Sequence, residues 1–172
     1  MAEQHYALRE FALLREKNES LNLYALVDGI QFDRFFDEPL KEDKNSRSLF
    51  SLPEDKILAF AGPWLLHVSK LARVHLDKII QLEKKYPAVS WIISEQPFVT
   101  FACHLESVLM VSLPTNERGL FRFYDCRVLK ILPEILSSEQ FNQLMKYSLR
   151  WCFLSEGHII SYPRDKETTE EL

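Results

Sequence analysis

The chain has 172 residues, a formal net charge of −4, and a composition that is 47% hydrophobic and 12% aromatic. This length and composition are typical of one globular domain that needs no metal or disulfide to fold. The acidic net charge and the lack of any run of five basic residues argue against a nucleic-acid-binding protein.

The first part of the chain predicts a helix, a buried strand and a polar loop. The apolar residues of 5–17 recur at helical spacing, which predicts an amphipathic helix. In LNLYALVDGI (21–30) they fill both faces, as is typical of a strand covered on both sides, and Asp28-Gly29 predicts a turn at its end. The charged stretch 37–48 is expected to be a loop.

The middle of the chain continues with helices and strands in alternation. Residues 57–69 are apolar, and their pattern leaves open a strand followed by a turn or a short buried helix. A helical pattern then covers 73–86 and ends at Pro87. The apolar run 89–94 predicts another buried strand, and 98–107 predicts a further helix.

The last part of the chain predicts two strands, two helices and a closing hairpin. VLMVSLP (108–114) is apolar enough for a third buried strand, and GLFRFYD (119–125) follows a turn as a fourth. A helix is expected from Cys126, and residues 137–140 have the spacing of a capping box that begins another. Residues 150–163 predict a strand or hairpin.

This alternation of helices and strands predicts the fold class and the domain limits. It favours an α/β fold in which helices flank a mixed, mostly buried β-sheet. We expect one domain over residues 1–163, followed by a charged, disordered tail over 164–172.

The cysteines and the apolar runs indicate the compartment. Cys103, Cys126 and Cys152 are odd in number and widely spaced, which favours free thiols buried in the core of a protein from a reducing compartment. The N-terminal sequence lacks the apolar region of a secretory signal. The longest apolar run, 57–68, is shorter than the ~20 residues that span a bilayer. We expect a cytoplasmic protein without membrane insertion.

Common catalytic and cofactor-binding motifs are missing from the sequence. Glycine occurs only at positions 29, 62, 119 and 157, so neither a GxGxxG motif nor a phosphate-binding P-loop can be written. The five histidines form no HxxxH or HExxH pair, none has a cysteine at zinc-site spacing, and no GxSxG motif occurs. The expectation is no cofactor, no metal site and no enzymatic activity.

The stretch GLFRFYDCRVL (119–129) combines polar residues with an otherwise apolar run. As a strand, it would place Arg122 and Tyr124 on one face, while Asp125 would cap the helix that follows. Arg127, in the first helical turn, needs an acidic partner, for which Asp125 and Asp28 are the candidates. One interpretation is a structural strand–helix junction with internal ion pairs. The other is a polar cluster at the carboxyl edge of the sheet, where α/β proteins bind ligands.

Four segments of the chain, taken in order, form a set of motifs. They are LYALVDGIQF (23–32), AGPWLLHV (61–68), HLESVLMVSLP (104–114) and GLFRFYDCRVLKILPEIL (119–136). Within them stand the run Arg122, Phe123, Tyr124, Asp125 and Arg127 and the elements Val27-Asp28-Gly29 and Gly62-Pro63-Trp64. The set resembles the type VI secretion adaptor family, the chaperone-like proteins that load toxic effectors onto the VgrG spike.

The resemblance implies a non-catalytic adaptor. Such a protein binds a secreted effector, commonly through the effector's N-terminal region, together with the C-terminal region of the VgrG spike protein. Two positions depart from the family pattern. Cys126 stands where a proline is usual, and Glu106 stands where a basic residue often follows His104-Leu105.

The residues expected to form the partner-binding or structural motif come from these segments. They are Asp28, Trp64, Arg122, Tyr124, Asp125 and Arg127. Aromatic and arginine side chains are the usual anchors of an interface, so Phe35 and Phe36 are further candidates. Trp64 and Trp91 are expected to be core residues, with a role as binding anchors as the second alternative.

Two other functions remain open at the level of the sequence. An immunity protein that neutralises a toxin would share this size and acidity. A small enzyme would place its site around Asp28, Arg122 and Asp125, and a pocket with a perturbed carboxylate there would favour it.

Overall fold

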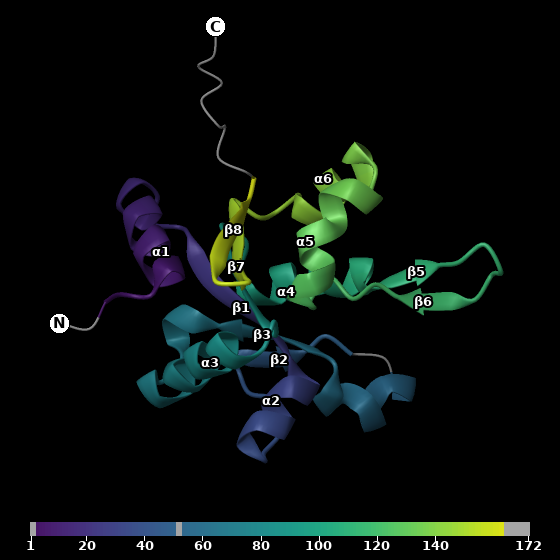
Figure 1. Cartoon of the computed structure of the whole chain (residues 1–172), viewed down its shortest axis with the longest axis horizontal. Helices are drawn as coiled ribbons and strands as arrows, with labels where there is room; N and C mark the ends of the chain where they lie inside the picture. Colours follow the sequence, from purple (N-terminus) through teal and green to yellow (C-terminus); the bar gives the residue numbers. More distant parts are fainter. Residues whose placement is uncertain (1–2, 51–52, 164–172) are drawn as a thin grey trace, which may run out of the picture.

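A computed structural model describes residues 3–50 and 53–163 of the chain. Its central feature is a six-stranded sheet in the order β2-β3-β1-β4-β7-β8 (Figure 1). The strands are β1 (Asn22–Asp28), β2 (Ser46–Ser48), β3 (Pro63–His67), β4 (Val89–Ser94), β7 (Arg150–Ser155) and β8 (His158–Tyr162). Every pair of neighbours in this sheet is antiparallel. The predicted tail, 164–172, lies outside the described residues.

Six α-helices, two 3₁₀ segments and a separate two-stranded sheet complete the described chain. The helices are α1 (Tyr6–Lys17), α2 (Gly29–Phe36), α3 (Arg73–Lys85), α4 (Phe98–Leu109), α5 (Cys126–Ile135) and α6 (Ser138–Met145). The 3₁₀ segments are η1 (Pro53–Ala61) and η2 (Val68–Lys70), and the small sheet joins β5 (Met110–Ser112) to β6 (Arg118–Leu120). Among the helices described, none is both long and apolar enough to cross a membrane.

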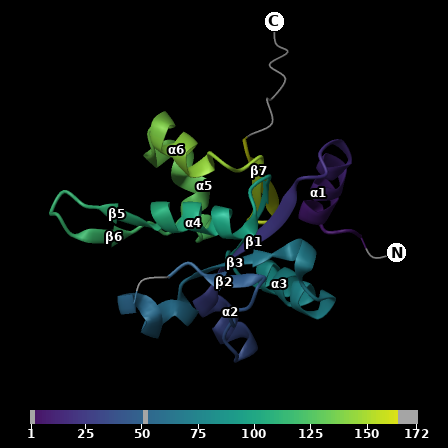
Figure 2. The ribbon, with the colours of Figure 1, turned by 180° about the vertical axis from the view of Figure 1, so that it is seen from behind.

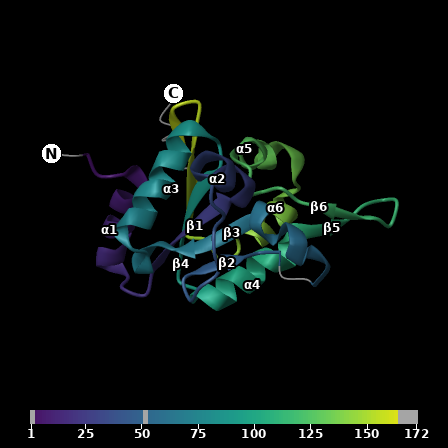
Figure 3. The same cartoon turned by 90° about the horizontal axis from the view of Figure 1, so that it is seen from below.

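Helices cover both faces of the large sheet, which gives three layers (Figure 3). The alternation of side chains along β1 shows why, since its apolar residues are buried on both faces. Tyr24 and Leu26 belong to a core shared with α4, α5 and α6, whereas the core around Ala25 is shared with α1, α2 and α3. The predicted α/β fold, with one buried sheet flanked by helices, is confirmed, but the sheet is antiparallel and not mixed as expected.

A buried carboxylate attaches α1 to the rest of the molecule. Glu83 of α3 accepts hydrogen bonds from the Tyr6 hydroxyl and the Trp91 indole N–H, both at 2.6 Å. Its other oxygen lies 2.6 Å from Nε2 of His5, the residue that caps α1. Because each carboxylate oxygen is engaged, Glu83 is buried without an unsatisfied oxygen. The helical pattern of α3 gave no sign of this role.

Most elements lie where the sequence predicts them. The predicted helices at 5–17, 73–86 and 98–107 and the strand at 89–94 are confirmed within two residues at each boundary. The capping box at Ser137 and the closing hairpin are confirmed as well. In the open case at 57–69, the strand followed by a turn is found, because β3 begins at Pro63 and is followed by η2. The short buried helix is not, since the 3₁₀ segment η1 that ends at Ala61 exposes Ile57 and Leu58.

Several predictions were wrong. Asp28-Gly29 is not a turn but the start of α2, and the 37–48 loop ends in β2. The run 108–114 is not a third buried strand, because only Met110–Ser112 form β5, outside the main sheet. The run 119–125 is a strand only up to Leu120, so Arg122 and Tyr124 share no strand face.

Two further expectations are corrected by the arrangement in space. Cys103 is exposed, whereas Cys126 and Cys152 are buried as predicted. Helical residues advance by about 100°, and α4 buries Phe101, Ala102, His104 and Leu105, which turns Cys103 outward. Neighbouring strands of the sheet run antiparallel, so the sheet has no shared carboxyl edge at which a ligand site would be expected.

Candidate functional site

The end of β1 and the start of α5 meet at one short segment of the chain. The Asp28 N–H donates to the Ala88 carbonyl at 2.9 Å, and the Cys126 N–H donates to the Pro87 carbonyl at 3.2 Å. Asp28 and Asp125, nearly a hundred residues apart in sequence, are thereby brought to the same part of the molecule. We call Asp28, Arg122, Tyr124, Asp125 and Arg127 the aspartate junction.

Each aspartate of the junction caps a helix. Asp28 Oδ1 accepts from the Ile30 N–H at 3.2 Å at the start of α2, and Asp125 Oδ1 accepts from the Arg127 N–H at 2.9 Å at the start of α5. The caps satisfy amide groups that have no partner within their helices. Both residues are buried, with exposed fractions of 4% and 6%. The predicted cap at Asp125 is confirmed.

Asp125 also binds the side chain of Arg127. The guanidinium Nε donates to Oδ1 at 3.0 Å and Nη2 donates to Oδ2 at 2.8 Å, which is a two-point contact. Burial raises the pKa of Asp125, but the hydrogen bonds and charge of Arg127 outweigh burial and hold it below its usual value. Asp125, rather than Asp28, is therefore the acidic partner expected for Arg127. The Arg127 side chain itself is 72% exposed, so a fixed cation faces the solvent.

Arg122 is held by an aromatic ring instead of a carboxylate. Its guanidinium carbon lies 5.7 Å from the centre of the Tyr124 ring, a cation–π geometry, and Tyr124 is buried while Arg122 is exposed. The pKa of Asp28 is raised chiefly by burial, although the Ile30 hydrogen bond and the charge of Arg122 act in the opposite direction. The charge of Asp125 raises it further.

The Gly62-Pro63-Trp64 segment packs directly against the start of α2. The Gly29 N–H donates to the Gly62 carbonyl at 2.8 Å, and a Cβ at Gly29 would lie 2.1 Å from the Phe60 carbonyl oxygen. The Trp64 indole donates to the same Phe60 oxygen at 3.2 Å. Glycine is therefore required at position 29 by close approach of backbone. Trp64 is buried in the core, as expected, and takes no exposed position.

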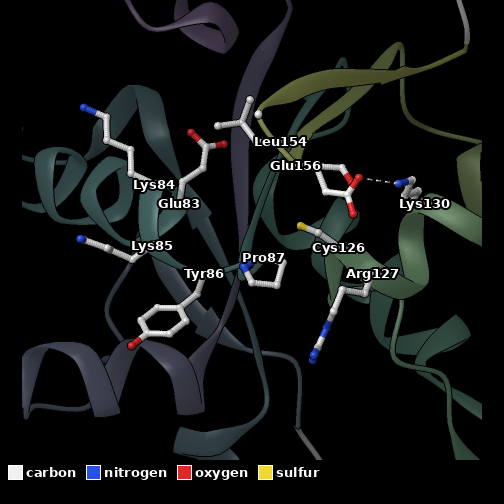
Figure 4. Close-up of a pocket in the computed structure, with 12 residues that line it drawn as sticks. Glu83, Lys84, Lys85, Tyr86, Pro87, Cys126, Arg127, Lys130, Leu154 and Glu156 are labelled. Atoms are coloured by element: carbon white, nitrogen blue, oxygen red, sulfur yellow. Dashed lines mark ion pairs between the residues drawn. The ribbon is translucent and has the colours of Figure 1, made fainter.

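A cleft of about 710 Å³ opens beside the aspartate junction (Figure 4). It lies between the end of α3, the start of α5 and the turn joining β7 to β8. Arg127 and Cys126 line it, but its described lining includes neither Asp28 nor Asp125. Lys130 and Glu156 form an ion pair across one wall at 3.8 Å, and the Lys84 and Lys85 side chains extend away from the centre (Figure 4).

The described lining of this cleft combines charged side chains of both signs with one thiol, that of Cys126. The pKa of Cys126 is raised to about 12, mainly by burial and then by the charge of Glu83, so its thiol stays protonated at neutral pH. Asp125 has both oxygens engaged by Arg127. Within residues 3–50 and 53–163, no group of three or more histidine, cysteine, aspartate or glutamate side chains is placed to hold a metal ion.

The remaining residues singled out by the sequence lie elsewhere. Phe35 and Phe36 are half-buried in α2 and pack against each other, and Phe35 also contacts Tyr86, on the α2–α3 side of the sheet. Glu106, which departs from the family pattern, pairs with Arg47 at 2.8 Å.

Sequence reasoning missed a second surface, on the hairpin formed by β5 and β6. Val111, Leu113 and Leu120 are about 40% exposed there, and the hairpin extends away from the large sheet (Figures 1 and 2). The sequence did contain a signal, because Pro114 and a short polar turn divide two apolar runs, as in a hairpin.

Comparison with known proteins gives one family. The family model described as "Domain of unknown function (DUF4123)" matches residues 23–143, about 70% of the chain, and spans every residue of the aspartate junction. No curated protein and no solved structure matches the chain.

Proposed function

The chain belongs to the DUF4123 family, and we propose that it is a non-catalytic cytoplasmic adaptor that binds a type VI secretion effector and helps load it onto the VgrG spike. The proposal takes its partners from the resemblance of the four ordered motifs. The effector would bind through its N-terminal region and the spike through its C-terminal region. No cofactor, nucleic acid or membrane takes part.

The observation that carries the proposal is the anchoring of Arg127. Its guanidinium is fixed by the two hydrogen bonds that it donates to a buried, helix-capping carboxylate, yet most of the side chain is exposed beside a cleft. Arginine is enriched among the residues that dominate binding energy at interfaces. A side chain already held in place loses less conformational entropy when a partner binds. Arg122, supported by the Tyr124 ring, offers a second cation of this kind.

The junction also supports a binding role over a catalytic one. A general acid or base must reach its substrate, and both aspartates are buried and occupied by helix capping. The exposed groups are arginines, which do not exchange protons at neutral pH.

The test is co-purification of the full chain with the N-terminal segment of the neighbouring effector and the C-terminal segment of the spike protein, each alone and then together. We expect a ternary complex, weakened by Arg127→Ala and by Arg122→Ala. Arg73→Ala is the matched control, because Arg73 is 79% exposed and pairs with Asp77 one turn along α3.

Each other outcome points to a different function. Binding only to the effector's toxic domain would indicate an immunity protein. Turnover of a substrate by the wild type, lost in Arg122→Ala, would indicate an enzyme. Equal weakening by Arg73→Ala would remove the aspartate junction from the interface.

A further inference from the structure

The hairpin of β5 and β6 is a sheet of only two strands. It pairs Met110 with Leu120, Val111 with Gly119 and Ser112 with Arg118, and no third strand joins it in the described chain. Two-stranded hairpins are marginally stable in water, whereas three strands with an apolar face hold together on their own. The addition of a third strand would therefore stabilise the hairpin.

The free edge of β5 can be identified from the hydrogen bonds that flank the hairpin. The Leu113 N–H donates to the Glu117 carbonyl at 2.9 Å, and the Phe121 N–H donates to the Leu109 carbonyl at 2.7 Å. In an antiparallel pair, bonded and non-bonded positions alternate. The backbone groups of Met110 and Ser112, which fall between these bonded positions, consequently point away from β6.

An apolar groove borders this same edge. Its volume is about 690 Å³, and it lies between β5, the end of α4 and the α6 helix. Met110 and Ser112 line it, and the apolar side chains facing it include Val108, Phe121 and Leu136. Glu139, in the first turn of α6, is the one charged side chain among the described lining residues.

We propose that an extended segment of the effector's N-terminal region adds to β5 as a third strand, with apolar side chains in the groove and a lysine or arginine next to Glu139. Strand addition uses main-chain hydrogen bonds for affinity, while pockets for alternate side chains give selectivity. The outward backbone groups of Met110 and Ser112 supply the main-chain hydrogen bonds, and the groove supplies the pockets for side chains. The lone carboxylate makes a basic residue in the segment complementary. This inference rests on the proposed adaptor function and adds the binding mode.

The decisive variant is Ser112→Pro in the full chain, tested by titration against the purified effector N-terminal fragment. Proline is tolerated where its missing N–H would face away from the ladder, so the hairpin keeps its own hydrogen bonds. We expect the dissociation constant to rise about tenfold or more, because one edge donor is lost and the ring blocks an added strand. Ser112→Ala retains the backbone and should bind within about twofold of the wild type.

A matched control lies on the opposite edge of the same hairpin. Leu120 pairs with Met110 across the ladder, so its N–H points away from β5, and Leu120→Pro should leave binding within about twofold. Glu139→Lys, at an exposed position, should weaken binding about fivefold through charge repulsion. Circular dichroism verifies the fold of each variant.

Hydrogen exchange of the wild type reports strand addition directly. Binding of the fragment should slow exchange at the Met110 and Ser112 amides, and a helix lying in the groove would leave them unprotected. Unchanged exchange there, or equal binding by Ser112→Pro and wild type, overturns the inference while the adaptor function stands. A concentration-dependent dimer that is lost in Ser112→Pro would assign the edge to a second copy instead. Failure of the wild type to bind any effector fragment removes the adaptor function itself.

Discussion

The aspartate junction and the β5–β6 hairpin differ in which of their groups are buried and which are exposed. At the junction, charged groups are buried and each aspartate is satisfied by backbone amides, with Arg127 completing the pairing of Asp125. On the hairpin, apolar side chains are exposed and one edge of backbone lies beside an apolar groove. The buried aspartates of the junction satisfy their own groups and fix a structure that holds Arg127 exposed for a partner, whereas the hairpin leaves its own groups open for one. The same substitution should therefore have different effects in the two regions.

The largest difference is expected for glycine to alanine. Gly29→Ala should lower the free energy of unfolding by about 3 kcal/mol, because the new Cβ meets the rigid Phe60 carbonyl. Gly119→Ala should cost less than about 1 kcal/mol, since the three atoms nearest its Cβ, the first at 3.1 Å, all belong to the Leu113 side chain, which can move. Urea denaturation of both variants measures the contrast. Equal losses would show that the two regions are equally constrained.

Removing a helix cap gives the next contrast. Asp125→Ala should destabilise the protein by about 2 kcal/mol, because a buried cap is lost together with the support of Arg127. Ser137→Ala removes the exposed cap of α6 and should cost about 1 kcal/mol. Thermal unfolding monitored by circular dichroism compares them. A larger effect at Ser137 would contradict the importance assigned to the junction.

The two aspartates should respond to pH in opposite directions. The folded-state pKa of Asp125 is lowered, so its contribution to stability is present above its ordinary pKa and is lost as pH falls through the folded value. The folded-state pKa of Asp28 is raised, so its contribution is present at low pH and is lost as pH rises through the folded value.

These signs define a comparison of two asparagine variants, which keep a capping side chain. Between pH 6 and pH 3, Asp125→Asn should lose less stability than the wild type, and Asp28→Asn should lose more. Urea midpoints measured at each pH give the three curves. Parallel curves would mean that folding shifts the pKa of neither carboxylate.

The smallest expected effect is a difference in the rate at which the cysteines react with a thiol reagent. It should involve no change in the stability of the protein. Exposed Cys103 should react rapidly with a thiol reagent such as Ellman's reagent. Cys126 and Cys152 should react only after unfolding, because burial is the main cause that raises the pKa of each to about 12. Cys103→Ser should abolish the rapid phase. A second rapid thiol would show that the junction or β7 opens in the native state.

Local interactions of the junction could be predicted from the sequence, and long-range ones could not. The Asp125 cap and its pairing with Arg127 involve residues two apart, so the sequence predicted the cap and included Asp125, beside Asp28, among the candidate partners of Arg127. The α2 helix was missed because it is short and begins with glycine, a poor helix former that suggested a turn. The approach of Phe60 to Gly29 depends on segments brought together only by the fold.

The β5–β6 hairpin shows a second limit of prediction from the sequence pattern. An apolar run such as 108–114 has the same pattern whether neighbours cover it or leave it exposed, so its place outside the main sheet could not be deduced. Burial of Glu83 was equally hidden, because its partners Tyr6 and Trp91 come from different elements. The helix containing it was nevertheless predicted correctly.

The position of β1 in the sheet has a consequence for how the chain acquires its structure. β1 is synthesised first among the strands, yet its neighbours are β3 and β4, and Asn22 pairs with Ser94 far along the chain. β4 in turn pairs with β7, which begins only at Arg150. On the ribosome, the apolar β1 must therefore wait until β4, which ends at Ser94, has emerged before both its edges are covered, and β4 must in turn wait for β7. Such distant pairing slows folding, so the sheet should form as a single late event after synthesis.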